Sequence, residues 1–122
     1  MEKRPLTIIL DIDGCIFKHS GKLSSQIAQG KFVQQILPGV VERFNEWDSK
    51  GYSIILLTGR KESARDVTEE QLRSYNLFWD QLVMGVGGGK RVLINDLKPN
   101  SDEPTAIAVN LVRNQGLKEV DI

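Results

Sequence analysis

Two carboxylates separated by one residue are the clearest chemical feature of the chain. Asp11 and Asp13 follow the apolar run Leu6–Leu10, and Gly14 comes directly after them. In extended backbone, residues two apart project to the same side, so both carboxylates should face one way and Ile12 the other. Carboxylates this close repel each other, which favours a shared proton or a bound cation. Taken alone, however, the pair is explained equally well as two acids that end a strand and cap a turn.

Two more polar groups stand at the ends of β-prone runs. Thr58, Gly59 and Arg60 follow Tyr52–Leu57, whereas Asn95 and Asp96 follow Arg91–Ile94. In open parallel α/β sheets, ligands bind beyond the carboxyl ends of the strands. Polar residues at three strand ends therefore predict one site that all three share.

The elements that must position these residues alternate between strands and helices. A third strand is expected over Gln81–Met84, and Pro38-Gly39 and Gly51 bracket a helix in which Phe44 and Trp47 face inward. Further helices are expected over Lys61–Asn76, where Thr68–Gln71 has the form of a capping box with a joint near Val67, and between Pro104 and Gly116, with Ile107 and Leu111 inward. This order predicts an α/β fold, a Rossmann-like three-layer sandwich with a mostly parallel sheet, in one domain over residues 1–122.

Composition narrows the class of protein. The chain has 122 residues, with 16 basic and 16 acidic side chains. This neutrality argues against a nucleic-acid partner. The apolar runs are too short to span a bilayer, so no membrane partner is expected. Cys15 is the single cysteine and cannot form an internal disulfide, which favours a reducing, cytoplasmic location.

Asp-Ile-Asp-Gly at 11–14, Thr-Gly-Arg at 58–60 and Ile-Asn-Asp at 94–96 together resemble the motifs of the haloacid dehalogenase (HAD) superfamily. The resemblance extends from Leu6 to about Gly116. It implies a Mg²⁺-dependent phosphatase in which Asp11 attacks phosphorus to form an aspartyl-phosphate. Asp13 would protonate the leaving oxygen and later deprotonate the attacking water.

The same resemblance implies the ligands of phosphate and metal. Thr58 would donate a hydrogen bond to a phosphoryl oxygen, aided by backbone amides near Gly59. The carboxylate of Asp11, the main-chain carbonyl of Asp13, and Asp96 would hold Mg²⁺. Asn95 and Asn100 replace the second acid of some families, and both can hold metal-bound water.

The lysine of the family's third motif has no single candidate. Lys90 begins the predicted strand that ends near Asp96, so at ~3.3 Å per residue it should lie about 20 Å from the site. Lys98 and Lys61 are nearer, and Lys98 is favoured of the three. Arg60 is a better source of positive charge near phosphate than any of these lysines.

Neither gap between the motifs is long enough for a cap domain, so a capless member is expected. Residues 15–37 are expected to form a flap, and a second subunit to complete the pocket, making the active form a homo-oligomer. Residues 93–99 resemble those of small phosphatases that act on sugar phosphates of surface-polysaccharide synthesis, so a small phosphorylated metabolite is the expected substrate. The alternative is a HAD-fold regulatory module that binds Mg²⁺ or phosphate without turnover. The uncertain lysine and the missing second acid beside Asp96 favour this alternative, whereas the intact Asp11/Asp13 pair opposes it.

Overall fold

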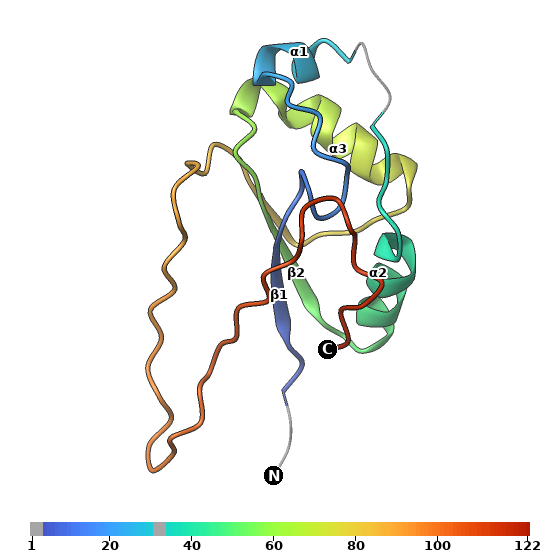
Figure 1. The fold of residues 1–122 in the computed structure, drawn as a ribbon. Coiled ribbons are helices and arrows are strands. Elements are labelled where there is room, and N and C mark those ends of the chain that lie inside the picture. The colour runs from blue at the N-terminus through green and yellow to red at the C-terminus, as the bar shows by residue number, and fades with distance from the viewer. Residues whose placement is uncertain (1–3, 31–33) are drawn as a thin grey trace.

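The computed structural model describes residues 4–30 and 34–122 and shows an α/β fold built on a parallel sheet (Figure 1). The α/β fold with a parallel sheet, which the alternation of strands and helices predicts, is confirmed. In chain order the elements are β1 (Thr7–Asp11), α1 (Ser24–Ala28), α2 (Val40–Ser49), β2 (Ser53–Leu57), the 3₁₀ turn η1 (Glu62–Ala64), α3 (Arg65–Ser74) and β3 (Gln81–Val83).

The three strands hydrogen-bond in parallel in the order β1-β2-β3. Thr7 pairs with Ser53 and Asp11 with Leu57, so the first two strands end at the same level. Their burial alternates: Ile8 and Ile54 are buried, whereas 48% of the Ile9 surface is exposed. A continuous apolar run such as Leu6–Leu10 is typical of a strand buried on both faces, but only one face of β1 packs into the core.

Helix α2 supplies much of the core on the buried face. Its inward residues Val40, Phe44 and Trp47 recur at helical spacing and pack in one cluster with the buried strand residues. Gly51 has a φ of +74°, the left-handed conformation that commonly ends a helix, as its position after the helix predicts. In Figure 1, α1 and α3 lie toward the carboxyl ends of the strands, where the predicted site belongs.

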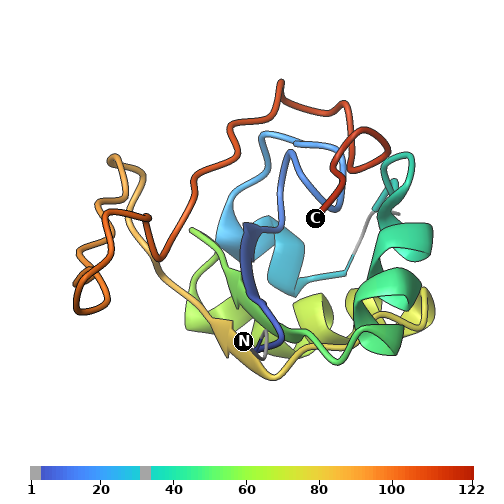
Figure 2. The same ribbon diagram turned by 90° about the horizontal axis from the view of Figure 1, so that it is seen from below.

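Residues 86–112 leave the body as a long excursion without helix or strand (Figures 1 and 2). The predicted fourth strand over Arg91–Ile94 and the predicted helix after Pro104 are both absent from this described segment. Strands and amphipathic helices are stabilised by the surface they bury, and here Ile94 and Ile107 are 89% and 74% exposed. Without a partner element, the apolar pattern alone does not produce the structure that it predicts.

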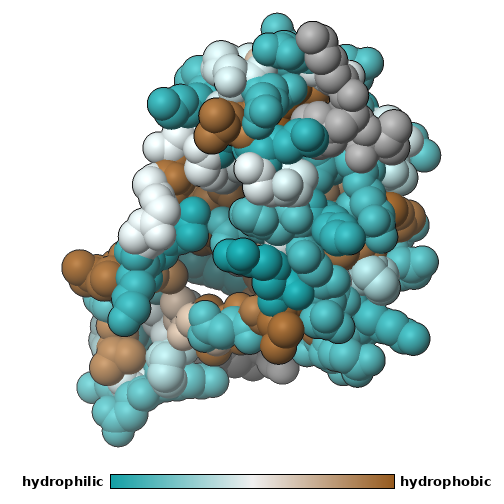
Figure 3. Space-filling model, turned by 45° about the horizontal axis from the view of Figure 1, so that its top comes forward, coloured by the Kyte–Doolittle hydropathy of each residue, from teal (hydrophilic) through white to brown (hydrophobic). Residues whose placement is uncertain are grey.

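Apolar side chains consequently gather on the surface of the excursion (Figure 3). They are Val92, Leu93, Ile94, Leu97, Ile107, Val109 and Val112. Within residues 4–30 and 34–122, no helix is long and apolar enough to cross a membrane.

The chain returns to the body after the excursion. The Leu117 amide donates to the Pro38 carbonyl at 2.9 Å, and Arg43 donates to the carbonyls of Leu117 and Lys118. Leu117 and Val120 are buried in the main core. The last residues therefore stabilise the start of α2 by both hydrogen bonds and apolar burial.

Candidate active site

A hollow of about 340 Å³ opens at the carboxyl ends of β1 and β2. Its walls combine acidic, basic and hydroxyl side chains with glycine backbone. The lining residues are Asp11, Ile12, Asp13, His19, Lys22, Ser24, Ile27, Thr58, Gly59, Arg60, Val86, Gly87, Gly88, Arg91 and Arg113. The first two predicted motifs thus meet in one place, as the parallel strands require.

The turn after β1 presents the two carboxylates. The carbonyl of Ile12 accepts hydrogen bonds from the amides of Ile16 and Phe17 at 2.8 and 3.1 Å, which closes a tight loop. Gly14 adopts a φ of +93°, a conformation that other residues rarely adopt. Ile12 is fully buried, whereas the side chains of Asp11 and Asp13 are partly exposed in the hollow.

Asp13 is held by a buried arginine. Arg60 donates from Nε to Asp13 Oδ2 at 2.9 Å and from Nη2 to Asp13 Oδ1 at 2.8 Å. This two-point geometry matches the fork of the guanidinium to the carboxylate. Asp13 is thereby fixed in orientation beside Asp11.

Thr58 stands directly after β2 and is buried. Its amide donates to the Val83 carbonyl at 3.0 Å, and its carbonyl accepts from the Val86 amide at 2.9 Å. Its Oγ1 accepts from the Arg60 amide at 3.1 Å. Because that bond uses the oxygen as acceptor, the hydroxyl proton can be donated to an anion in the hollow, the role that the family resemblance implies.

Two arginines that sequence reasoning missed line the same hollow. Arg91 Nη2 lies 3.2 Å from Asp11 Oδ1, and both side chains are 41% exposed. Arg113 lies against Gly14 and also lines the hollow. Arg91 comes shortly after a glycine-rich run, and this run could have indicated that the chain bends back toward β1 there. Nothing in the sequence around Arg113 indicates its place at the hollow.

Residues from the predicted flap form one wall. His19, Lys22, Ser24 and Ile27 all line the hollow, and α1 packs against η1 and α3. The Ser24 hydroxyl oxygen accepts from the Lys61 amide at 2.9 Å, which connects this segment to the loop after β2. Residues 31–33 of the predicted flap lie outside the described residues.

The structure does not bring the Ile-Asn-Asp motif at 94–96 to the hollow. Asp96 and Lys98 are exposed in the excursion, where the Asp96 carbonyl accepts a hydrogen bond from Thr105 Oγ1 at 3.0 Å. The other predicted residues of this region also lie away from the hollow, namely Lys90, Asn95 and Asn100. Consequently, the described part of the chain contains no group of three acidic, histidine or cysteine side chains placed to hold a metal ion.

Cys15 is adjacent to the acidic pair but is not suited to nucleophilic chemistry. Burial, together with the neighbouring Asp11 carboxylate, raises the pKa of its thiol. A raised pKa keeps the sulfur protonated near neutral pH, whereas a nucleophilic cysteine needs the thiolate. The carboxylates therefore remain the candidate nucleophiles of this site.

Carboxylates, a buried threonine and arginines therefore surround one hollow at the carboxyl edge of a parallel sheet. The family model of the HAD superfamily, subfamily IIIB (acid phosphatase), matches residues 1–94. The chain belongs to this family. The resemblance inferred from the motifs is therefore confirmed.

Solved structures share part of this fold. A chain in the structure of a Pnkp1/Rnl/Hen1 complex is 26% identical with a TM-score of 0.57, over 72% of this chain and 30% of that one. A second structure, of the Pnkp1/Rnl/Hen1 RNA repair complex, is 27% identical with a TM-score of 0.55, over 71% and 28% of the two chains. A structural-genomics target from Vibrio cholerae shares the fold at 17% identity and a TM-score of 0.51, over 74% and 79%. No curated protein matches the chain significantly.

Proposed function

We propose that the chain is a Mg²⁺-dependent phosphomonoester hydrolase that acts through an aspartyl-phosphate on Asp11. The observation that carries the proposal is the placement of Asp11, Asp13 and Thr58 around one hollow at the carboxyl ends of β1 and β2. Asp11 ends β1, and its carboxylate is 41% exposed there. A phosphate ester can reach it.

Each residue has a definite chemical role in the proposed reaction. A carboxylate oxygen of Asp11 attacks phosphorus, and the bond from phosphorus to the ester oxygen breaks as Asp13 gives that oxygen a proton. Asp13 then takes a proton from water, whose oxygen attacks phosphorus and releases inorganic phosphate. This second step restores the Asp11 carboxylate. Thr58 donates a hydrogen bond to a phosphoryl oxygen, which orients the group for both steps.

The residues present fit a magnesium ion in part. Mg²⁺ is commonly held by one or two carboxylates together with water and substrate phosphate, and Asp11 with the carbonyl of Asp13 would supply protein oxygens at the hollow. Asp96 would have to approach from the excursion. When bound, the ion supplies positive charge that offsets the repulsion between carboxylate and phosphate.

The expected substrate is a small phosphorylated metabolite such as a sugar phosphate, handled in the cytoplasm. The neutral net charge and the modest hollow support a small ligand. His19, Lys22, Ser24 and Ile27 of the predicted flap line the hollow, and a second subunit would complete its wall. A terminal phosphate of RNA is the second candidate, supported by the likeness to a chain of an RNA repair complex and by Arg91 and Arg113 at the hollow. The chain spans less than a third of that relative's length.

Phosphate release tests this proposal. Inorganic phosphate should appear from para-nitrophenyl phosphate with Mg²⁺, stop on chelation and return when Mg²⁺ is restored. A panel of sugar phosphates, nucleotides and RNA with a terminal phosphate should then give the highest kcat/KM for a sugar phosphate. Binding of Mg²⁺ without phosphate release from any of these compounds would support the non-catalytic regulatory module instead.

The metal assignment has its own test. Asp96→Ala should weaken Mg²⁺ binding measured by calorimetry, whereas Asp102→Ala in the same excursion should not. Equal Mg²⁺ affinity in both variants would show that Asp96 is not a ligand.

A further inference from the structure

Arg60 does not have the contacts expected of a phosphate ligand. It stands in the Thr-Gly-Arg motif at the hollow, yet the residue is only 3% exposed. A guanidinium has five N–H donors and no acceptor. What those donors contact decides what the residue can do.

All five donors are used on protein atoms. Two go to the Asp13 carboxylate, as described above, and a second bond from Nη2 goes to Gln34 Oε1 at 3.3 Å. From Nη1, one bond goes to Thr68 Oγ1 and one to Gln71 Oε1, both at 2.9 Å. The guanidinium carbon also lies 6.0 Å from the centre of the Phe17 ring.

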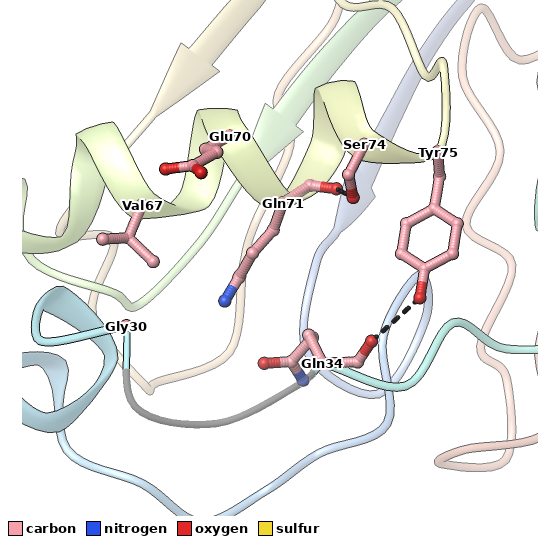
Figure 4. A pocket seen from close by; sticks show the side chains of 7 residues that line it. All are labelled: Gly30, Gln34, Val67, Glu70, Gln71, Ser74 and Tyr75. Carbon is pink, nitrogen blue, oxygen red and sulfur yellow. Dashed lines mark hydrogen bonds between the residues drawn. The ribbon is translucent and has the colours of Figure 1, made fainter.

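The acceptors behind Arg60 come from a different part of the molecule than the hollow. Thr68 and Gln71 lie one turn apart on α3, and Gln34 is held by its carbonyl, which accepts from the Tyr75 hydroxyl at 3.1 Å (Figure 4). Thr68 is fully buried. Its expected role in a capping box is therefore wrong: α3 begins at Arg65, and Thr68 inside the helix serves as an acceptor for Arg60.

We infer that Arg60 is a positioning residue for Asp13, held from behind by Gln34, Thr68 and Gln71, and that phosphate is met by other cations. The inference rests on the proposed role of Asp13 as acid and base. A carboxylate held at both oxygens by a rigid fork cannot turn away from the leaving oxygen, so its proton transfer is preorganised. Because the network already occupies every N–H of Arg60, the charge of phosphate is met instead by Arg91 and Arg113, which line the hollow.

A pair of matched esters separates the two roles of Arg60. Phenyl phosphate needs a proton on its leaving oxygen, whereas para-nitrophenyl phosphate has a much better leaving group and needs that proton far less. Loss of a general acid should therefore reduce kcat strongly for the first ester and weakly for the second. Loss of a phosphate contact should affect both esters alike and weaken inhibition by inorganic phosphate.

Asp13→Asn sets the reference for this experiment. It should reduce kcat for phenyl phosphate by ~10²–10⁴-fold and affect para-nitrophenyl phosphate much less. Arg60→Lys keeps the positive charge but loses the two-point contact with Asp13. It should reduce kcat for phenyl phosphate by about 10-fold or more and kcat for para-nitrophenyl phosphate much less. The inhibition constant of phosphate should not change. Arg73→Gln, an exposed arginine of α3, should change neither ester.

A milder variant keeps the test decisive if Arg60→Lys does not fold. Thr68→Val preserves shape and removes one acceptor of Nη1 without touching Asp13 or the hollow. It should give the same preference for the better leaving group, more weakly. If either variant slows both esters equally and raises the inhibition constant of phosphate, Arg60 binds phosphate and the inference is wrong. If Asp13→Asn itself shows no dependence on the leaving group, the proposed role of Asp13 fails instead.

Discussion

Gly116 packs against the backbone of Pro38 in the loop before α2. Replacing Gly116 with alanine should therefore destabilise the fold. Its φ is +82°, and a Cβ there would lie 2.2 Å from the Pro38 carbonyl oxygen and 2.9 Å from the Pro38 nitrogen. The left-handed backbone costs a non-glycine residue about 1–2 kcal/mol. Forcing a methyl group against fixed backbone adds about 1–3 kcal/mol. The expected loss in the free energy of unfolding is thus about 2–5 kcal/mol.

Gly51→Ala is the matched control. Gly51 has a similar φ of +74°, but a Cβ there would meet nothing within 4 Å, so only the conformational cost of about 1–2 kcal/mol applies. In urea denaturation, Gly116→Ala should lower the midpoint by about 1–2 M and Gly51→Ala by about half as much, with unchanged slopes. Equal losses for the two variants would refute the steric part of this reasoning. They would show that the segment after the excursion does not press on Pro38 in solution.

Three further predictions concern the hollow. Arg91→Gln should raise KM for para-nitrophenyl phosphate about 10-fold, which corresponds to the loss of one charged hydrogen bond. The free energy of unfolding should change little, because the ion pair of Arg91 is exposed. An unchanged KM would mean that Arg91 does not contact phosphate. Because burial and Asp11 raise the pKa of the Cys15 thiol, its alkylation by iodoacetamide at pH 7 should be slower than in urea-unfolded chain and should accelerate at higher pH; equal rates in both states at pH 7 would contradict this. Replacing residues 19–30 by a Gly/Ser linker should raise KM for a sugar phosphate, and light scattering during gel filtration should show an oligomer; a monomer with unchanged kinetics would favour a macromolecular substrate.

The parts of the fold that follow from the sequence are those in which local pattern and burial agree. Val40, Phe44 and Trp47 recur at helical spacing, and α2 buries all three. The apolar run Leu6–Leu10 likewise predicted a strand, and β1 covers Thr7–Asp11.

The parts that failed depend on contacts between distant residues. Ile94 and Ile107 carry the apolar pattern of a strand and a helix, yet the excursion buries neither side chain. The side-chain partners of Arg60 could not be predicted for a related reason. Its charge suggested phosphate, but the acceptors on Thr68 and Gln71 become its partners only when α3 packs beside the hollow. The sequence around Arg60 does not indicate that Thr68 and Gln71 will contact its guanidinium.

Phosphate release by Asp11→Asn tests the central claim most directly. The substitution keeps the size of the side chain and removes the charged oxygen that would attack phosphorus. With para-nitrophenyl phosphate and saturating Mg²⁺, turnover should fall to background while the circular dichroism spectrum and the urea midpoint stay close to those of the parent. A folded Asp11→Asn protein that releases phosphate at the parent rate would show that Asp11 is not the nucleophile.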